Sequence, residues 1–196
     1  MGQTLLRADI VVTLDSRHHL YRPGYLVVEG NQLIETGPQC ALNGRSFDQE
    51  IDLAGRLVMP GLVNAHTHTP MVLFRGLAEG YSLLTFEGWT NGIRVWEEVM
   101  DAGMVSPAVA VSCAEMIRTG TTCFAYQYFY MDRIVPVVRQ SGMRAALAYG
   151  IVEMGAQETR ERELSAAAAF LEQVQDDPRI TGWVGPHAFF VDNGPE

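Results

Sequence analysis

The sequence predicts an α/β protein in which an all-β amino-terminal segment precedes strands that alternate with helices. Over residues 1–55, short apolar runs are separated by Gly, Pro, Asn and Asp, which is typical of strands and tight turns. From residue 57 onward, strand-like and helix-like segments alternate in units of about 30 residues, a rhythm typical of βαβ units and a parallel sheet. With 196 residues, 47% of them hydrophobic, the chain can bury a core.

The amino-terminal segment, residues 1–55, is expected to be a small β structure. Residues 5–14 are predicted to form one strand, and residues 25–34 two short strands around a Gly-Asn turn. The same pattern continues over residues 51–57. The histidine pair at 18–19 lies between two strands and beside an arginine, so a surface turn is favoured over a ligand role for it.

The second segment, residues 56–196, is expected to hold four strands and their connecting helices. Its first run, residues 57–65, is almost continuously apolar, which predicts a strand buried on both faces. A long loop with an aromatic stretch is expected to follow it. The other strands are predicted over residues 121–129, 144–152 and 180–187, the helices over 102–119, 132–140 and 158–175, and a further helix start over 191–196.

A pair of histidines follows the first strand of this segment. Residues two apart in a strand point to the same side, so His66 and His68 can share one metal ion. A lone His-x-His motif is weak evidence for a metal site. Its place at the carboxyl end of an apolar strand fits a barrel whose active site is built at that face.

Several short motifs lie around these strands. They are VMPGLVNAHTHTPM at 58–71, LFRGLAE at 73–79, GTTCF at 120–124, GMR at 142–144 and GPHA at 185–188. With these motifs the chain resembles the amidohydrolase superfamily. More closely, it is similar to the branch that holds methylthioadenosine/S-adenosylhomocysteine deaminases and triazine hydrolases.

The resemblance implies a fold of which the chain supplies only a part. The family fold is a distorted, metal-dependent (β/α)8 barrel with a small β-sandwich made from both ends of the chain. Residues 1–55 would belong to the sandwich, which leaves 196 − 55 = 141 residues for a barrel that usually needs about 250. Residues 56–196 would then be the first four βα units, and the chain would be the amino-terminal half of an enzyme.

The resemblance also assigns site residues. His66 and His68 match two ligands of one divalent metal ion, most often Zn2+ and in some members Fe2+. Glu98 matches a glutamate that holds the ribose, and His187 a histidine that contacts substrate. Arg160 matches a substrate-binding arginine or belongs to the charged face of its helix. The proton-transferring glutamate, the remaining histidines and a metal-binding aspartate would lie beyond residue 196, so no catalytic acid or base is expected here.

The chain departs from the family pattern at positions that the resemblance places against substrate. Tyr126 stands where an aspartate is usual, Gln127 where Met is frequent, and Tyr149 where some members that accept homocysteine have an arginine. Residues 189–191 also differ from the usual continuation. These changes disfavour S-adenosylhomocysteine and leave methylthioadenosine, deoxyadenosine, another aminopurine or a triazine.

The expected reaction is hydrolytic deamination of an aminopurine nucleoside. The alternatives are a triazine chloro- or aminohydrolase, and a non-catalytic remnant that needs a carboxyl-terminal partner. Two histidines alone make a weak zinc site, and a half-barrel leaves two open sheet edges. The isolated chain is therefore expected to be inactive, to bind metal poorly, and to associate as a homo-oligomer or with a carboxyl-terminal half.

The composition limits the classes of partner that the chain can bind and the number of metal ions in its site. The net charge of −9 argues against a nucleic-acid or anionic-membrane partner. All 14 basic residues are arginine, so no carbamylated lysine can bridge two metals, which supports a single metal ion. The three cysteines are widely spaced, and neither a signal peptide nor a membrane-spanning run is evident, so a cytoplasmic location is expected.

Overall fold

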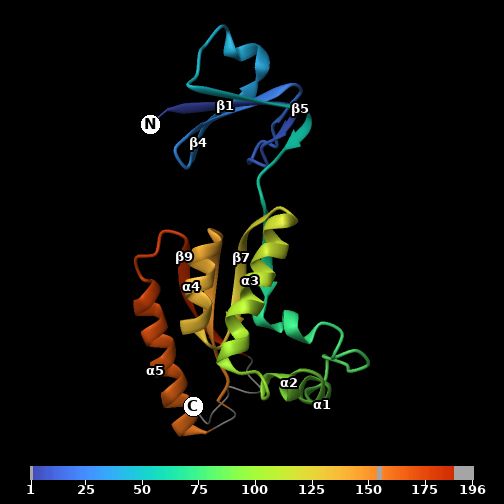
Figure 1. Cartoon of the computed structure of the whole chain (residues 1–196), viewed down its shortest axis with the longest axis vertical. Coiled ribbons are helices and arrows are strands. Elements are labelled where there is room, and N and C mark those ends of the chain that lie inside the picture. Colours follow the sequence, from blue (N-terminus) through green and yellow to red (C-terminus); the bar gives the residue numbers. More distant parts are fainter. Residues whose placement is uncertain (1, 154–155, 188–196) are drawn as a thin grey trace. The chain divides into compact units, whose positions relative to one another are not determined.

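The computed structural model describes residues 2–153 and 156–187. The chain divides into two compact units, Met1–Pro60 and Gly61–Glu196 (Figure 1). The division expected after residue 55 lies five residues earlier, inside a strand of the first unit. Residues 188–196, where the further helix start is expected, lie outside the described residues.

The first unit is a five-stranded sheet, as the alternating pattern of its sequence predicts. Four of its strands lie in the order β2-β1-β3-β4, and the fifth, β5, pairs with β1 in parallel. Leu5, Tyr25, Val27 and Leu42 form a small core. Gly30 has a φ of 60° and makes the tight turn of the β3–β4 hairpin. The strands are β1 (Gln3–Val12), β2 (Leu20–Tyr21), β3 (Gly24–Glu29), β4 (Gln32–Pro38) and β5 (Gln49–Val58).

The predicted histidine turn lies between β1 and β2. The His18 side chain is exposed, and Nδ1 of His19 pairs with Oδ2 of Asp15 at 2.6 Å. The backbone N–H of His19 also donates to Asp15, at 3.0 Å. The pair is therefore part of a surface turn.

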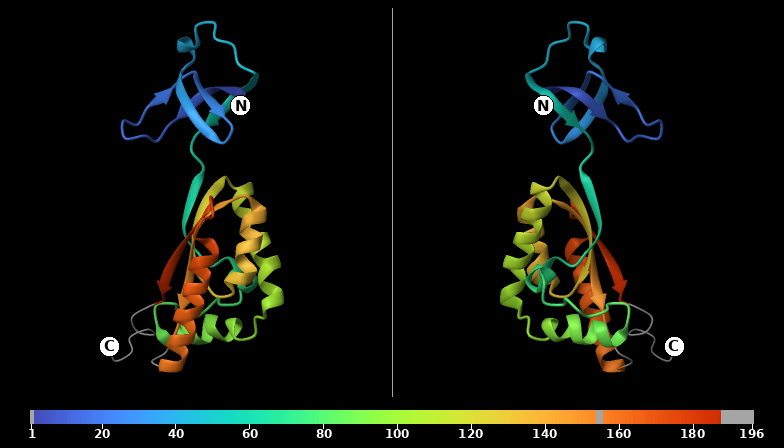
Figure 2. Two further views of the ribbon diagram at one scale, coloured as in Figure 1. Left: turned by 90° about the vertical axis from the view of Figure 1, so that its left-hand side faces the viewer. Right: turned by 90° about the vertical axis from the view of Figure 1, so that its right-hand side faces the viewer.

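The second unit contains the four parallel strands that the sequence predicts, connected by helices (Figures 1 and 2). Strand order follows the sequence, β6-β7-β8-β9, and every neighbouring pair is parallel. The strands are β6 (Leu62–Thr67), β7 (Thr121–Tyr128), β8 (Arg144–Ile151) and β9 (Ile180–Pro186), and the helices are α3 (Ala102–Arg118), α4 (Met131–Ser141) and α5 (Gln157–Val174).

Local signals set the ends of these helices. The Asp101 carboxylate accepts hydrogen bonds from the backbone N–H groups of Gly103 and Met104, at 2.7 and 3.1 Å, and so caps α3. Gly142, with a φ of 78°, ends α4 in the left-handed conformation that glycine adopts without strain.

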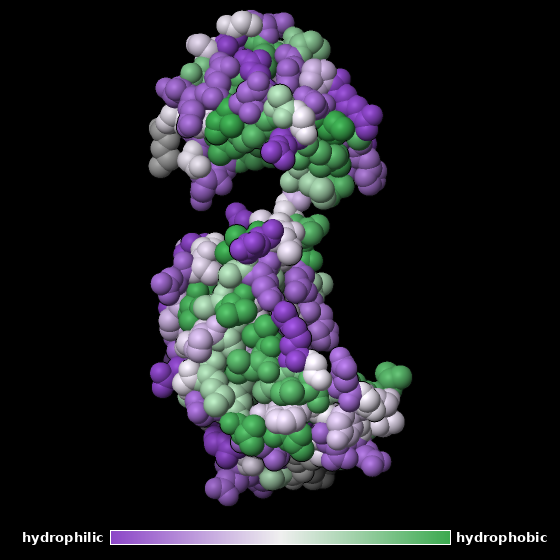
Figure 3. Space-filling view, turned by 45° about the vertical axis from the view of Figure 1, so that its right-hand side comes forward, coloured by the Kyte–Doolittle hydropathy of each residue, from purple (hydrophilic) through white to green (hydrophobic). Residues whose placement is uncertain are grey.

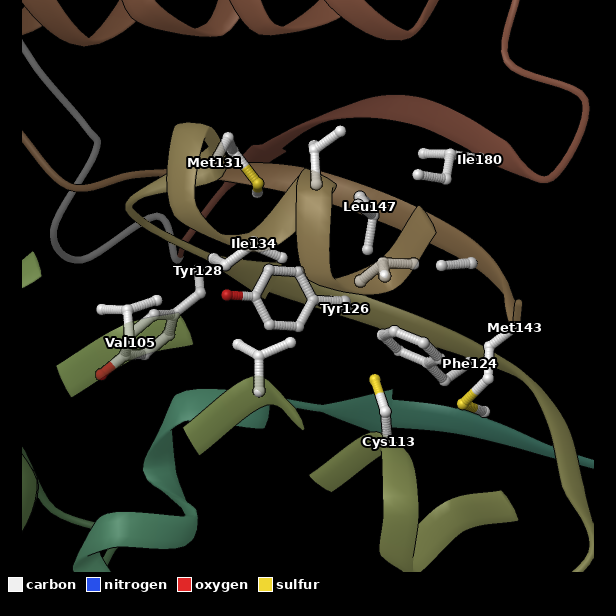
Figure 4. Close-up of a cluster of buried hydrophobic side chains, with 14 of the residues drawn as sticks. Val105, Cys113, Phe124, Tyr126, Tyr128, Met131, Ile134, Met143, Leu147 and Ile180 are labelled. Atoms are coloured by element: carbon white, nitrogen blue, oxygen red, sulfur yellow. The ribbon is translucent and has the colours of Figure 1, made fainter. Parts of the chain in front are cut away.

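All three long helices pack on one face of the parallel sheet (Figure 2). Phe124, Tyr126 and Tyr128 alternate along β7 and point into this layer, as their period of two requires. Figure 4 shows the cluster they form with side chains of α3, α4 and β8. Among the fully buried members are Val105 and Val109 of α3, Ile134 of α4 and Leu147 of β8.

The prediction of a first strand buried on both faces is wrong. The apolar run is divided, because β5 ends at Val58 and β6 begins at Leu62. The side chains of Leu62 and Val63 are 52% and 66% exposed. The reason is that β6 is an outer strand of the described sheet, with β7 as its one hydrogen-bonded neighbour there, so side chains on both of its faces have fewer packing partners.

The opposite outer strand is exposed in the same way. In β9, Trp183 is 58% and Val184 51% exposed. Figure 3 shows apolar side chains between polar ones on one face of the second unit.

The segment after β6 contains short helical turns within the long loop that the sequence predicts, and residues 75–85 belong to no helix or strand. Thr85 caps the first α-turn by accepting from the backbone N–H of Gly88 at 3.1 Å. A π-helical turn follows before the chain reaches α3. The turns are η2 (Thr69–Phe74), α1 (Phe86–Trp89), η3 (Thr90–Arg94) and α2 (Val95–Glu97).

Across the described residues, no single helix has the length and apolar character to cross a membrane. Phe86–Glu97 and Ala102–Arg118 together reach the required length and composition, with a 105° bend between them. The buried face of α3 belongs to the core just described.

Candidate active site

The two histidines of the His-x-His motif meet at the carboxyl end of β6. Their Nε2 atoms lie 3.2 Å apart, and the rings are perpendicular with centroids 5.1 Å apart. The pairing of β6 with β7 is irregular between Asn64 and Thr67, and the backbone N–H of His66 donates to the Asn64 side chain at 3.3 Å. This irregular strand end turns both rings toward one point.

The neighbouring strand orients one of these rings. Nδ1 of His68 lies 2.6 Å from the backbone carbonyl oxygen of Gln127 in β7. A carbonyl oxygen only accepts, so Nδ1 carries the proton and Nε2 keeps its lone pair. Burial lowers the pKa of His68, against the opposing effect of this hydrogen bond, and so favours the neutral form that binds metal.

The histidine pair fits part of a zinc site. Two nitrogens bound to one tetrahedral ion at about 2.0–2.1 Å are about 3.3 Å apart, close to the separation of the two Nε2 atoms. Structural and catalytic zinc sites use three or four protein ligands. Within residues 2–153 and 156–187, no group of three His, Cys, Asp or Glu side chains could hold a metal ion. The described residues therefore supply two ligands of such a site.

A cavity of about 590 Å³ opens beside the two histidines. This volume is within the range of small-molecule sites. Trp89 contributes an aromatic wall and lies 5.4 Å from the His187 ring, centroid to centroid. The lining consists of His66, His68, Met71, Leu83, Leu84, Thr85, Phe86, Trp89, Ile93, Glu97, Gln127, Tyr128, Phe129, Gly150, Val152 and His187.

His187, predicted to contact substrate, lies in this cavity directly after β9. Its backbone N–H donates to the carbonyl oxygen of Ile151 at 3.0 Å, which anchors the residue to the end of β8. The Nδ1 atom is buried and has no hydrogen-bond partner in the part of the chain that the structure describes. The described residues therefore leave this buried nitrogen without a hydrogen bond.

The structure places Glu97, and not Glu98, in the cavity lining. Glu98 is exposed, whereas the Glu97 side chain is only 9% exposed and pairs with Nη1 of Arg94 at 2.9 Å. The π-helical turn over Thr90–Arg94 adds a residue to a helical turn and shifts the following side chains by about one position. The residue types of this segment do not reveal this shift.

Arg160 is held in an ion pair away from the lining. Its Nε and Nη2 atoms lie 2.5 and 3.0 Å from the two carboxylate oxygens of Glu153. The Glu153 side chain is 2% exposed, and neither residue lines the cavity. This pair connects the segment after β8 to the first turns of α5.

Gln127, which the resemblance places against substrate, lines the cavity, and so does Tyr128, for which the sequence predicted no role. The pattern of β7 places both residues at the end of that strand, but it does not show that this strand end lies at the cavity. Burial and the nearby Glu97 carboxylate raise the pKa of Tyr128, so its hydroxyl stays protonated.

The fold and the site define an α/β protein whose cavity-lining side chains gather at the carboxyl ends of parallel strands, as in (β/α)8 barrels. The chain belongs to the amidohydrolase family, whose sequence model matches residues 57–193.

Known deaminases resemble most of the chain. A 5'-deoxyadenosine deaminase of Methanosarcina barkeri is 36% identical over 192 residues, which cover 96% of this chain and 43% of that protein. A 5'-deoxyadenosine deaminase of Methanococcus aeolicus is 41% identical over 142 residues, which cover 70% of this chain and 32% of that protein. The chain thus spans less than half the length of these relatives.

Solved structures agree with this family fold. An adenosine deaminase from Xanthomonas campestris with bound zinc matches with a TM-score of 0.83 and 27% identity, covering 96% of this chain and 43% of that one. A triazine hydrolase from Arthrobacter aurescens matches with a TM-score of 0.84, covering 98% of this chain and 48% of that one. At 18% identity, the second likeness concerns the fold alone. The predicted α/β class, part of an amidohydrolase barrel, is confirmed.

Proposed function

We propose that this chain is the part of a metal-dependent aminohydrolase that binds an aminopurine nucleoside, with 5'-deoxyadenosine as the leading substrate. The observation that carries the proposal is the pair of Nε2 atoms of His66 and His68, 3.2 Å apart at the edge of a largely apolar cavity. The names of the deaminase relatives support the choice of substrate.

His66 and His68 would hold the divalent ion, which we propose to be Zn2+. The zinc bound in the Xanthomonas campestris adenosine deaminase structure supports this choice. A bound zinc ion supplies a Lewis acid that makes water nucleophilic near neutral pH. The other ligands and the proton-transferring glutamate are proposed to come from the portion of the relatives that this chain does not cover.

The cavity suits a flat base attached to a sugar. Phe86 and Trp89, whose ring centroids are 5.8 Å apart, offer aromatic surface for stacking on a purine. We assign the ribose contact to Glu97 instead of Glu98, because only Glu97 lines the cavity. A carboxylate accepts hydrogen bonds from two neighbouring hydroxyls, as a ribose presents them.

His187 would hold the base during the reaction. In deamination, the oxygen of water bonds to the ring carbon that carries the amine, and the amine leaves as ammonia. The Nδ1 atom of His187 has no described protein partner, so it can hydrogen-bond a purine nitrogen or a sugar oxygen. Such a contact fixes the ring carbon relative to the histidine pair.

The ion pair of Arg160 supports a substrate with an uncharged 5' group. No lysine exists in the chain, and no arginine is among the described residues that line the cavity. A phosphate or carboxylate on the substrate would therefore meet Glu97, whose partner Arg94 lies outside the lining. The substrate-binding role predicted for Arg160 would require the Glu153 pair to open.

The test is ammonia release by a full-length protein in which residues 1–196 are followed by the carboxyl-terminal part of the Methanosarcina barkeri relative. Zinc-loaded protein is offered 5'-deoxyadenosine, methylthioadenosine and a chlorotriazine side by side. We expect ammonia from the two nucleosides and none after His66→Ala or His68→Ala, whereas His18→Ala in the surface turn leaves the rate unchanged. A folded, zinc-loaded hybrid that releases no ammonia from either nucleoside would refute the proposal.

A further inference from the structure

The side chain of Gln127 lines the cavity and extends from β7 over the neighbouring strand β8 to β9. Its Nε2 donates a 2.6 Å hydrogen bond to the carbonyl oxygen of Gly185, which lies two strands away in β9. The cavity lining includes Gln127 together with His66, His68 and His187. The amide therefore lies among the groups that a ligand would contact.

Two glycines make room for this amide. Gly150 of β8 and Gly185 of β9 are register partners. A Cβ atom at Gly185 would lie 2.9 Å from the Gln127 Nε2 atom, and one at Gly150 would lie 3.5 Å from its Cγ atom. A side chain at Gly185 would thus displace the amide, so this position requires glycine for the observed path.

The carbonyl of Gly185 also fixes which way the amide faces. Only the nitrogen of a glutamine amide can donate to a carbonyl oxygen, so Nε2 faces Gly185 and Oε1 faces away from it. Across the described residues, Oε1 of Gln127 has no hydrogen-bond partner and is not among the buried unpaired atoms. Oε1 and the second N–H of Nε2 are therefore free to bind a ligand.

We propose that Gln127 is the specificity residue that selects a 6-aminopurine over a 6-oxopurine, an inference that rests on the proposed function. A glutamine amide pairs with adenine by accepting from the exocyclic amine and donating to a ring nitrogen. The free Oε1 and N–H of Gln127 are these two groups. An oxopurine presents an acceptor where adenine presents the amine, and the amide cannot flip to match it without losing the bond to Gly185.

Substitution of the side chain can test this role without moving the metal site. The backbone carbonyl of Gln127, and not its side chain, holds His68. Gln127→Met keeps the length and apolar stem of the side chain and removes both polar atoms. Gln173→Met, at an exposed position of α5, is the matched control for the same exchange.

The experiment is isothermal titration of the 196-residue chain with 5'-deoxyadenosine and with 5'-deoxyinosine, in EDTA so that no turnover occurs. We expect the unsubstituted chain and Gln173→Met to bind the amino ligand about tenfold more tightly than the oxo ligand. We expect Gln127→Met to bring the two affinities within about twofold of each other. The ratio of the two affinities is compared within one protein. Partial unfolding of a variant would weaken the apparent binding of both ligands equally, and so would leave this ratio unchanged.

A preference for the amino ligand that survives Gln127→Met would overturn the inference and leave the proposed function standing. Equal binding of the two ligands by the unsubstituted chain would overturn it as well. Failure of the unsubstituted chain to bind either ligand would overturn both proposals.

Discussion

The backbone carbonyl oxygen of Gln127 accepts a 2.6 Å hydrogen bond from Nδ1 of His68, so a residue of β7 sets the orientation of a ring at the end of β6. The side chain of the same residue reaches Gly185 in β9, two positions before His187. Gln127 thus connects the strand ends that carry the three histidines of the cavity. Contacts of this kind orient the ligands of metal sites and raise their basicity.

Glu97 and Glu98 give the sharpest test of how the nucleoside binds. Glu97→Gln is expected to weaken binding of 5'-deoxyadenosine about five- to tenfold, because a neutral amide accepts weaker hydrogen bonds from ribose hydroxyls. Glu98→Gln is its matched control and should leave the affinity unchanged, because Glu98 lies outside the lining. Titration calorimetry of the two variants measures the difference. The reverse order of effects would return the ribose contact to Glu98.

The ion pair of Arg160 with Glu153 should matter for stability. Arg160→Met would leave the carboxylate of Glu153 buried without its arginine, at an expected cost of about 3 kcal/mol in the free energy of unfolding. Arg162→Met, on the same helix, removes a more exposed partner of Glu163 and should cost under about 1 kcal/mol. Urea unfolding monitored by circular dichroism compares the two. Equal losses would show that burial of the Glu153 pair contributes nothing.

Asp177 should make the stability of the second unit depend on pH in the acidic range. The hydrogen bond from Arg139, at 2.7 Å, lowers the pKa of Asp177 below its ordinary value of 3.8, and the backbone N–H groups of Arg179 and Ile180 add to the shift. Because the pKa is lower in the folded state, this contribution is complete above about pH 4 and is lost as the pH falls through the folded pKa. Asp177→Asn removes the titration. Between pH 6 and pH 3, the free energy of unfolding should therefore fall less for Asp177→Asn than for the unsubstituted chain. Equal decreases in the two proteins would contradict this role of Asp177.

The exposed apolar side chains of the outer strands should cause the 196-residue chain to associate. Trp183 is 58% exposed on β9 and Val63 66% exposed on β6, and both strands have a free edge in the described sheet. Trp183→Ser with Val63→Ser is expected to shift the chain toward monomer in sedimentation velocity. Leu20→Ser, at an exposed position of the first unit, is the control. A chain that is monomeric without substitution would refute the expected association.

Periodicity in the sequence was sufficient to predict most elements of the fold. The apolar alternation over residues 121–129 became β7, and the segment 158–175, with its alanine run and Glu–Arg pairs, became α5 to within a residue at each end. Local patterns determine these elements. The exposure of β6 could not be predicted in this way, because burial depends on which strands and helices lie next to it.

The candidate site was only partly predictable for the same reason. The spacing of His66 and His68 follows from strand geometry, and the structure brings His187 into the same cavity. The position of Glu97 in the lining, with Glu98 outside it, follows a π-helical turn that residue types do not reveal. The bond from Gln127 to Gly185 joins strands that are separated by a third one, which no local pattern encodes.

The most direct test of the metal site is the zinc content of the full-length hybrid protein, measured by mass spectrometry after dialysis against metal-free buffer. We predict about one zinc ion per chain for the unsubstituted protein and for His18→Ala, and less than about a tenth of that for His66→Ala and for His68→Ala. A folded His66→Ala or His68→Ala protein that keeps a full equivalent of zinc would contradict the central claim that these two imidazoles hold the ion.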